Sequence, residues 1–179
     1  MNGREMYRNL AIDGKPVQQE MEKLSGAWSK GEFGTMLLDL FSRETGALFH
    51  FRKNSTIAGM PAAVYDFQVR SENSHWGVGV GAEIVFPAYK GSVWINRENG
   101  RTLRIERKTQ DMPPRFPVSM VETAADYQFI RIGGTREFLL PARSETLICQ
   151  RGSYNCSRNT IDFRNYKKYS AETSINFDE

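Results

Sequence analysis

The sequence predicts a mainly β (α+β) protein: a curved antiparallel meander sheet, or incomplete barrel, with one covering amphipathic helix over residues 31–44. From residue 46 to the end, apolar and polar residues alternate with the period of two that is typical of half-buried strands. Short turn signals separate the alternating stretches, and strands joined by tight turns must run in opposite directions. Only one stretch has helical spacing instead.

The strands follow from this alternation and from the turn residues between them. Asn99-Gly100 is a strong hairpin signal because its turn requires positive φ angles. Pro87 ends one strand because proline has no N–H for the ladder. Strands are expected at residues 4–12, 47–57, 63–70, 78–86, 91–95, 101–108, 123–132, 137–148, 160–166 and 173–177.

The helix is predicted from five apolar residues at i, i+3, i+4, i+7 and i+8. They are Phe33, Met36, Leu37, Leu40 and Phe41, and Gly46 is a plausible stop signal. One apolar helix face beside a long sheet implies that the helix covers the concave side of that sheet.

Composition indicates a globular protein and excludes several classes. The chain has 179 residues, of which 40% are hydrophobic, and this excludes disorder, collagen and coiled coil. No stretch approaches the ~20 consecutive apolar residues of a membrane helix. We find no repeat and no linker, so we expect a single domain over residues 1–179.

The formal net charge is only +3, whereas a nucleic-acid binder usually has a concentrated basic stripe. We therefore expect no nucleic-acid partner. The most basic region is residues 143–168. It is interpreted as the solvated face of strands, whose charges also oppose aggregation, with contact to anionic lipid headgroups as the alternative.

The two cysteines predict the compartment. Cys149 and Cys156 flank a turn-like stretch between strand-like segments, which places both thiols across a hairpin where a disulfide is feasible. A zinc site is the alternative, but His50 and His75 are distant. A disulfide favours an extracytoplasmic location, in the periplasm or secreted. Residues 1–5 do not begin an apolar leader, so we expect that a signal peptide and part of the native N-terminal segment have been removed.

Two motifs suggest catalysis or cofactor binding, and each has the wrong context. Residues 77–82 (GVGVGA) match a loose dinucleotide fingerprint, but a strand follows where a helix is needed. Residues 27–31 (AWSKG) approach a nucleophile elbow around Ser29 without the strand–helix–strand framework of that motif. A dyad of Ser29 with His50 or His75 stays a remote alternative, against a helix-capping role for Ser29.

Metal sites are not indicated either. His75 lies in a predicted turn, and the acidic residues are scattered without metal-ligand spacing. We expect no catalytic residues, no metal and no cofactor, and a protein that is not an enzyme.

The aromatic residues, 12% of the chain, favour a core with an apolar cleft between sheet and helix. Phe33, Met36, Leu37 and Leu40 are expected to line the helix side of the cleft. Tyr65, Phe67, Trp94, Tyr127 and Phe129 are expected to line the sheet side.

Several stretches resemble a group of uncharacterised exported bacterial proteins and the periplasmic lipoprotein-carrier (LolA/LolB-like) superfamily. They are residues 64–67 (VYDF), 89–96 (YKGSVWIN), 100–106 (GRTLRIE), 138–145 (FLLPARSE) and 159–166 (NTIDFRNY). The resemblance implies an incomplete antiparallel barrel that wraps around helices and encloses an apolar cavity. It covers about two thirds of the chain and provides no catalytic residues to transfer. The chain departs from the pattern in starting within a strand and in having no lipobox cysteine.

These observations predict a non-enzymatic extracytoplasmic protein that binds an apolar or lipid-like ligand, or a protein partner, between sheet and helix. The first alternative is a structural or protein-interaction domain of a larger cell-envelope protein. The remote alternative is a serine hydrolase using Ser29.

Overall fold

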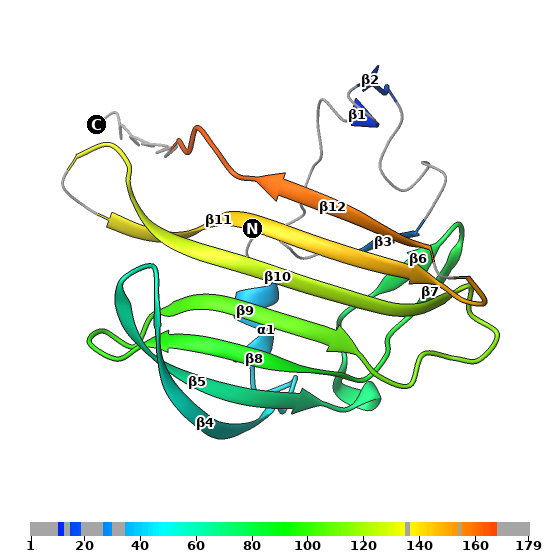
Figure 1. Ribbon diagram of the computed structural model, residues 1–179, viewed down its shortest axis with the longest axis horizontal. Coiled ribbons are helices and arrows are strands. Elements are labelled where there is room, and N and C mark those ends of the chain that lie inside the picture. Colours follow the sequence, from blue (N-terminus) through cyan, green and yellow to red (C-terminus); the bar gives the residue numbers. More distant parts are fainter. Residues whose placement is uncertain are drawn as a thin grey trace, which may run out of the picture.

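The computed structural model describes residues 11–12, 15–18, 27–29, 35–134, 137–153 and 155–167. Its main feature is a seven-stranded antiparallel sheet in the order β12-β11-β10-β9-β8-β5-β4, as Figure 1 shows. The strands are β4 (Leu48–Ile57), β5 (Met60–Val69), β8 (Tyr89–Asn96), β9 (Thr102–Thr109), β10 (Val118–Arg131), β11 (Glu137–Gln150) and β12 (Cys156–Asp162). The sheet does not close, because β4 and β12 remain its two edges. The predicted antiparallel, mainly β architecture is confirmed.

The meander is interrupted once, between β5 and β8. Here the chain forms the short 3-10 turn η2 (Ser71–Asn73) and the strands β6 (Val78–Val80) and β7 (Glu83–Val85). These two strands join β3 (Ala27–Ser29) in a separate three-stranded sheet. The prediction of one strand over 78–86 is therefore wrong. Gly81, with a φ of 59°, adopts the left-handed conformation that reverses the chain between β6 and β7.

The helix ends earlier than predicted, at Leu40 instead of residue 44. Helix α1 spans Thr35–Leu40, six residues, and residues 31–34 with Phe33 lie outside the described part. Hydrogen bonds of short polar side chains with nearby groups compete with further helical turns. The hydroxyl oxygen of Ser42 accepts from the backbone N–H of Thr45 at 3.2 Å, and the Thr45 hydroxyl donates to Asp39 at 2.9 Å. The helix therefore ends at Leu40, and turns continue to Gly46.

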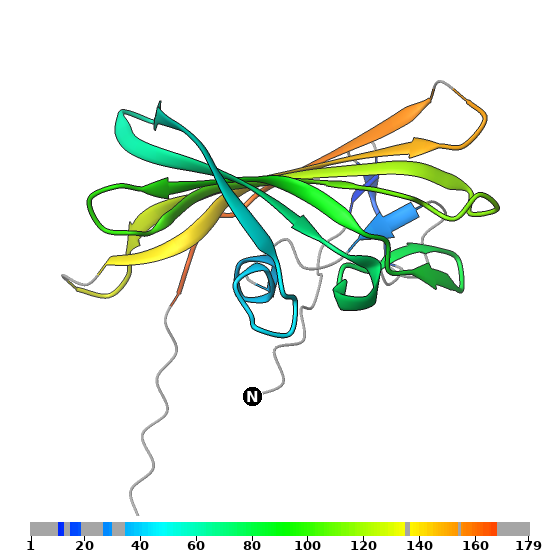
Figure 2. The same ribbon diagram turned by 90° about the horizontal axis from the view of Figure 1, so that it is seen from below.

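The core lies on one side of the main sheet. Met36 and Leu40 of α1 belong to one buried cluster together with sheet residues such as Val93, Ile105 and Ala125. Figure 2 shows α1, η2 and the β6–β7 hairpin on that same side of the twisted sheet. We call this side the helix face and the opposite side the open face.

Other boundaries also differ from the sequence expectations. Strand β10 begins at Val118 instead of 123, and β12 occupies Cys156–Asp162 instead of 160–166. Of the first expected strand, residues 4–12, only β1 (Ala11–Ile12) is described, and it pairs with β2 (Lys15–Pro16). The expected strand at 173–177 lies outside the described residues.

Candidate functional site

The strand register divides the side chains of the main sheet between its two faces. Residues paired across antiparallel strands point to the same face, and neighbours along a strand point to opposite faces. One cross-strand row runs Tyr65–Val93–Ile105–Ala125 and lies on the helix face. The adjacent row runs Asp66–Ser92–Glu106–Ala124–Glu145, and it therefore lies on the open face.

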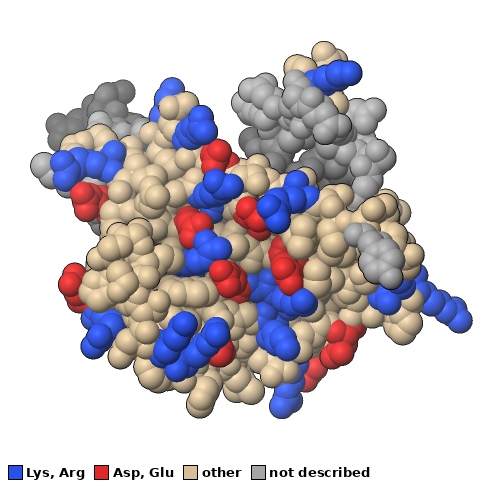
Figure 3. Space-filling model, viewed as in Figure 1, with Lys and Arg blue, Asp and Glu red and all other residues tan. Residues whose placement is uncertain are grey.

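The open face is hollowed. A solvent-open depression of about 1000 Å³, which we call the hollow, lies over β4, β5 and β8 to β12. Its open-face lining is Leu48, His50, Arg52, Asp66, Gln68, Lys90, Ser92, Glu106, Lys108, Glu122, Ala124, Glu145, Leu147 and Arg158. Phe49, Phe67, Gly91, Arg107 and Thr123, from the intervening rows, also border it. Ser92 and Ala124 are small residues in a row flanked by long charged side chains, and this difference in size creates the depression. Figure 3, which views this face, shows acidic and basic side chains interspersed across it.

Ion pairs organise the walls of the hollow. Lys108 lies 2.8 Å from Glu122, Arg158 lies 3.3 Å from Glu145, and Arg52 lies 3.5 Å from Asp66. These groups are partly exposed, so each pair adds little to stability. They join long charged side chains around Ser92 and Ala124.

Arg104, outside the hollow's lining, joins two further carboxylates. Its Nε lies 2.8 Å from Glu106, and its Nη1 contacts Asp126 across the strand pair. Burial lowers the pKa of Arg104, but the hydrogen bonds and charges of Asp126 and Glu106 outweigh burial and raise the pKa overall. The guanidinium is thus held as a fixed cation between two carboxylates.

Lys90 is the exception to this pairing. Its direct cross-strand neighbours are Gln68 and Lys108, so two ammonium-bearing chains lie side by side. Within the described ranges, Lys90 has no ion-pair partner. Like charges placed directly opposite one another are unfavourable in a sheet. The hollow therefore contains a charge that no ion pair among the described side chains compensates.

The residues predicted to line one apolar cleft do not line a common cleft. Met36, Leu40, Phe67 and Tyr127 are buried together in the core cluster, and Leu37 and Tyr65 are partly buried against it. Trp94 pairs with Arg104, so it points to the open face, away from the helix. Phe129 is 37% exposed near the end of β10. The prediction grouped Trp94 with the wrong face because Val93 and Ile95, on either side of it, are apolar as well.

A buried arginine lies beneath the sheet on the helix face. Arg107 is 5% exposed, its guanidinium lies 3.9 Å from the centre of the Trp76 ring, and its Nε donates to the Thr123 hydroxyl at 3.0 Å. The guanidinium is also close to Tyr89, 5.8 Å from that ring. Burial and the nearby Asp39 raise the pKa of Tyr89 to about 12, although Arg107 opposes the shift. Trp76 and Tyr89 of this cluster belong to the buried core.

An Asp–His pair lies at the margin of this cluster, and sequence reasoning missed it. His75 Nδ1 lies 2.7 Å from Asp39 Oδ1, and the imidazole is 55% exposed. Asp39 also accepts from the hydroxyls of Thr45 and Tyr89, at 2.9 and 3.4 Å. The pair links α1 to the segment before β6. His75 and Asp39 are 36 residues apart and in different elements, so no sequence spacing signals the contact.

The two motifs that suggested catalysis or cofactor binding lie in short antiparallel strands. Ser29 ends β3, which pairs with β6, and no strand at residues 27–29 was expected. The capping role of Ser29 stays a prediction, because residues 30–34 lie outside the described part. Residues 77–82 span β6 and the turn into β7, so strand follows the glycines. His50 lines the hollow, and Ser29's side chain lies outside the described residues.

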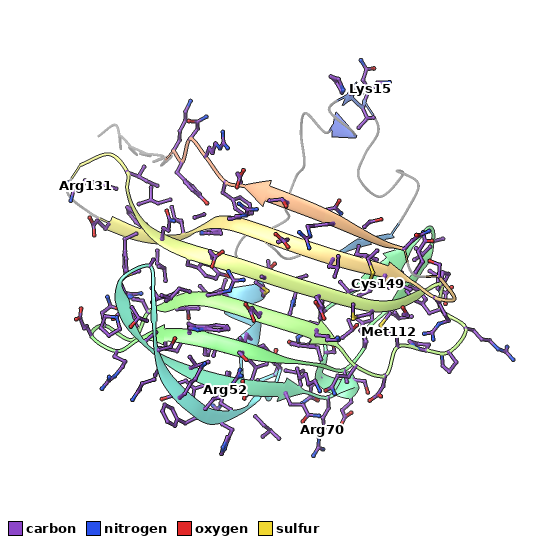
Figure 4. All side chains as sticks on the ribbon, viewed as in Figure 1. Lys15, Arg52, Arg70, Met112, Arg131 and Cys149 are labelled. Atoms are coloured by element: carbon purple, nitrogen blue, oxygen red, sulfur yellow. A yellow bond between two sulfur atoms is a disulfide. The ribbon has the colours of Figure 1, made fainter. Side chains whose placement is uncertain are left out.

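The predicted disulfide is present between Cys149 and Cys156. The two residues form a direct cross-strand pair of β11 and β12, with Cα atoms 4.1 Å apart. Beside it, Arg151 donates to the carbonyls of Phe116 and Pro113 at 2.9 and 3.0 Å. Figure 4 shows Cys149 and Met112 at the same end of the sheet. The hairpin is thus fixed to the loop that precedes β10.

The basic region of residues 143–168 is organised by ion pairs where it is described. Arg143 and Arg158 both approach Glu145, and Arg164 lies 3.3 Å from Asp162. These contacts agree with a solvated charged face. No group of three or more His, Cys, Asp or Glu side chains suited to a metal ion occurs among the described residues. No helix in the described ranges is long and apolar enough to cross a membrane.

Comparisons of the chain with protein-family models, with curated proteins and with solved structures found no match.

Proposed function

We propose that the protein is a non-enzymatic binding domain of an oxidising, extracytoplasmic compartment, and that its ligand lies in the hollow on the open face. The observation that carries the proposal is the position of the free space. A depression of about 1000 Å³ lies over the charged face, whereas the helix face is occupied by one packed cluster. The Cys149–Cys156 disulfide supports the compartment.

The lining of the hollow favours a ligand with charged or polar groups over a wholly apolar one. Carboxylates and cations alternate along its walls, and Lys90 carries a charge that no described side chain neutralises. An anionic group placed between Lys90 and Lys108 would relieve their repulsion. Leu48 and Leu147, toward opposite sides of the hollow, provide apolar contacts for the rest of the ligand.

The carrier-like resemblance suggests a different location, with an apolar or lipid-like ligand between sheet and helix. Such a ligand requires α1 to move away from the sheet, because Met36 and Leu40 are 3% and 2% exposed in the core. The two open edges, β4 and β12, favour the alternative of a protein-interaction domain, since unpaired edges can accept a further strand. A hydrolase using Ser29 has no supporting observation in the described residues.

The experiment fills the hollow. Ala124→Trp places a bulky side chain in the hollow, and Glu98→Trp, in the exposed β8–β9 turn, is the matched control. Each protein is exported to a bacterial periplasm, purified without detergent and examined by native mass spectrometry. We expect a co-purifying small molecule on the wild type and the control, and its loss from Ala124→Trp. A ligand retained equally by Ala124→Trp contradicts the location. Ligand-free protein in all three cases contradicts the proposal as a whole.

A further inference from the structure

The edge strand β4 exposes several large apolar side chains. All ten of its residues are exposed or partly exposed. Leu48 is 65%, Phe49 40% and Phe51 49% exposed. Large apolar side chains gathered on a surface generally mark a site of contact with a partner or a membrane.

The end of α1 extends this apolar surface. Leu38 and Phe41 are 76% and 48% exposed, and their i, i+3 spacing places them on one side of the chain. The rings of Phe41 and Phe49 are stacked with their centres 5.5 Å apart. Phe49 and Phe51 pair with the helix-face residues Phe67 and Tyr65, whereas Leu48 points to the open face. Together they expose apolar side chains on both sides of the border formed by β4 and the end of α1, and we call Leu38, Phe41, Leu48, Phe49 and Phe51 the apolar edge.

Positive charge accompanies the apolar edge. Strand β4 carries Arg52 and Lys53 and no acidic residue, and Arg43 follows α1. Arg52 forms an ion pair with Asp66, with its Nη1 3.5 Å from the carboxylate Oδ1. Arg43 and Lys53 have no ion pair within the part of the chain that the structure describes, although Glu44 adjoins Arg43 in sequence. Figure 4 shows Arg52 and Arg70 along this border of the sheet, away from Arg131.

A second copy of the chain fits this edge poorly. Symmetric antiparallel pairing of two β4 strands places the two-fold axis at the strand centre, between Arg52 and Lys53. Each Arg52 would then face the other copy's Lys53, with four cations at one point. The ladder is also irregular between Phe51 and Lys53, and such a bulge hinders edge-to-edge pairing.

We propose that the apolar edge rests on an anionic lipid surface. Phenylalanine and leucine side chains enter the boundary of the acyl chains, while the long stems of Arg43, Arg52 and Lys53 let their charges reach lipid phosphates. A lipid surface accepts protruding side chains without a complementary groove. The contact orients the molecule edge-on, so the hollow, which shares Leu48 and Phe49 with the edge, opens close to the membrane.

The test is co-sedimentation of the purified full chain with vesicles of phosphatidylcholine alone and with vesicles containing about one third phosphatidylglycerol. Leu38→Ser with Phe51→Ser removes apolar contact, and Lys53→Glu reverses a charge. The controls are Ile84→Ser with Phe86→Ser, which are 48% and 53% exposed on and beside β7, and Arg131→Glu. Thermal unfolding establishes whether each variant is folded. If the double variant does not fold, the single variant Leu38→Ser is tested in its place.

We expect binding to the anionic vesicles that weakens as salt is added. Lys53→Glu should lower the binding constant about tenfold or more, because each basic side chain near such a surface contributes roughly a fivefold gain. The double apolar variant should bind at least about tenfold more weakly, and both controls should bind like the wild type. Three results overturn the proposal: no binding to anionic vesicles, equal loss in the controls, or a wild-type dimer that the apolar-edge variants dissociate. The ligand experiment on Ala124 is independent of all three.

Discussion

The guanidinium of Arg107 lies 3.9 Å over the ring of Trp76, buried on the helix face of the sheet. This contact connects β9 to the segment between η2 and β6, which leaves the main sheet and returns at β8. The buried charge is stabilised because the flat guanidinium stacks on the Trp76 indole and its Nε donates to the Thr123 hydroxyl.

We therefore expect Arg107→Lys to lower the free energy of unfolding by roughly 2 kcal/mol, since lysine keeps the charge but loses the planar stacking and the Nε donor. Urea denaturation measures the change. The control is Arg131→Lys, 65% exposed, which should alter stability by no more than about 0.5 kcal/mol. Equal effects of the two substitutions would show that the stacking contributes nothing.

Gly91 is required where β8 approaches β9. A Cβ atom at this position would lie 1.8 Å from the carbonyl oxygen of Glu106 and 2.8 Å from Cζ of Phe67. Gly91→Ala should therefore destabilise the fold by more than about 3 kcal/mol or prevent folding. Gly77→Ala is the matched control, because its Cβ would first meet side-chain atoms at 3.4 Å. Circular dichroism during heating distinguishes the two, and a stable Gly91→Ala would refute the close approach.

Substitution of Lys90 is expected to stabilise the fold, unlike the substitutions of Arg107 and Gly91. Lys90→Glu replaces a like-charge neighbour of Lys108 by an attractive one, so the free energy of unfolding should rise by about 0.5 kcal/mol at low salt. Lys90→Gln should give a smaller gain, and added salt should reduce both. If Lys90 faces a compensating anion in the free protein, the two variants will be destabilised instead.

Alkaline pH should destabilise the protein through its buried tyrosines. Burial is the main cause that raises the pKa of Tyr89 to about 12, and burial also raises the pKa of Tyr127. Between about pH 10 and pH 12, Tyr89 loses its proton in the unfolded chain but keeps it in the folded protein, so stability falls as pH rises. Tyr89→Phe should flatten this part of the stability profile by up to about 3 kcal/mol. An unchanged slope would mean that Tyr89 is not protected from ionisation.

Local sequence patterns predicted the meander well, because they depend on neighbouring residues alone. The Asn99-Gly100 turn and the hairpin closed by Cys149 and Cys156 lie where alternation and turn chemistry place them. The helix was predicted too long since apolar spacing continues to Phe41, whereas the hydrogen bonds around Ser42 and Thr45 end it earlier. Apolar periodicity does not register such a competition.

The candidate site was less predictable, because alternation separates two faces without showing which one is covered. Tyr65 and Asp66 lie on opposite faces, as alternation within the expected strand 63–70 requires, but the hollow depends on the small residues Ser92 and Ala124 falling in one cross-strand row, on either side of Glu106. That placement is set by register, and Ser92 and Ala124 are 32 positions apart in the sequence. Recurrent charges at Arg104, Glu106 and Lys108 are the one sequence signal that could have indicated a charged open face.

The most direct test of the central claim compares two positions on β5 that face opposite sides of the sheet. A photo-crosslinking phenylalanine derivative is introduced at Gln68, which lines the hollow, or at Tyr65, which packs against the core on the helix face. The protein is illuminated with its co-purified ligand, and the mass of the crosslinked product is measured. We expect the ligand to be attached at position 68 and not at 65. Attachment at 65 alone would place the ligand between sheet and helix and would contradict the account.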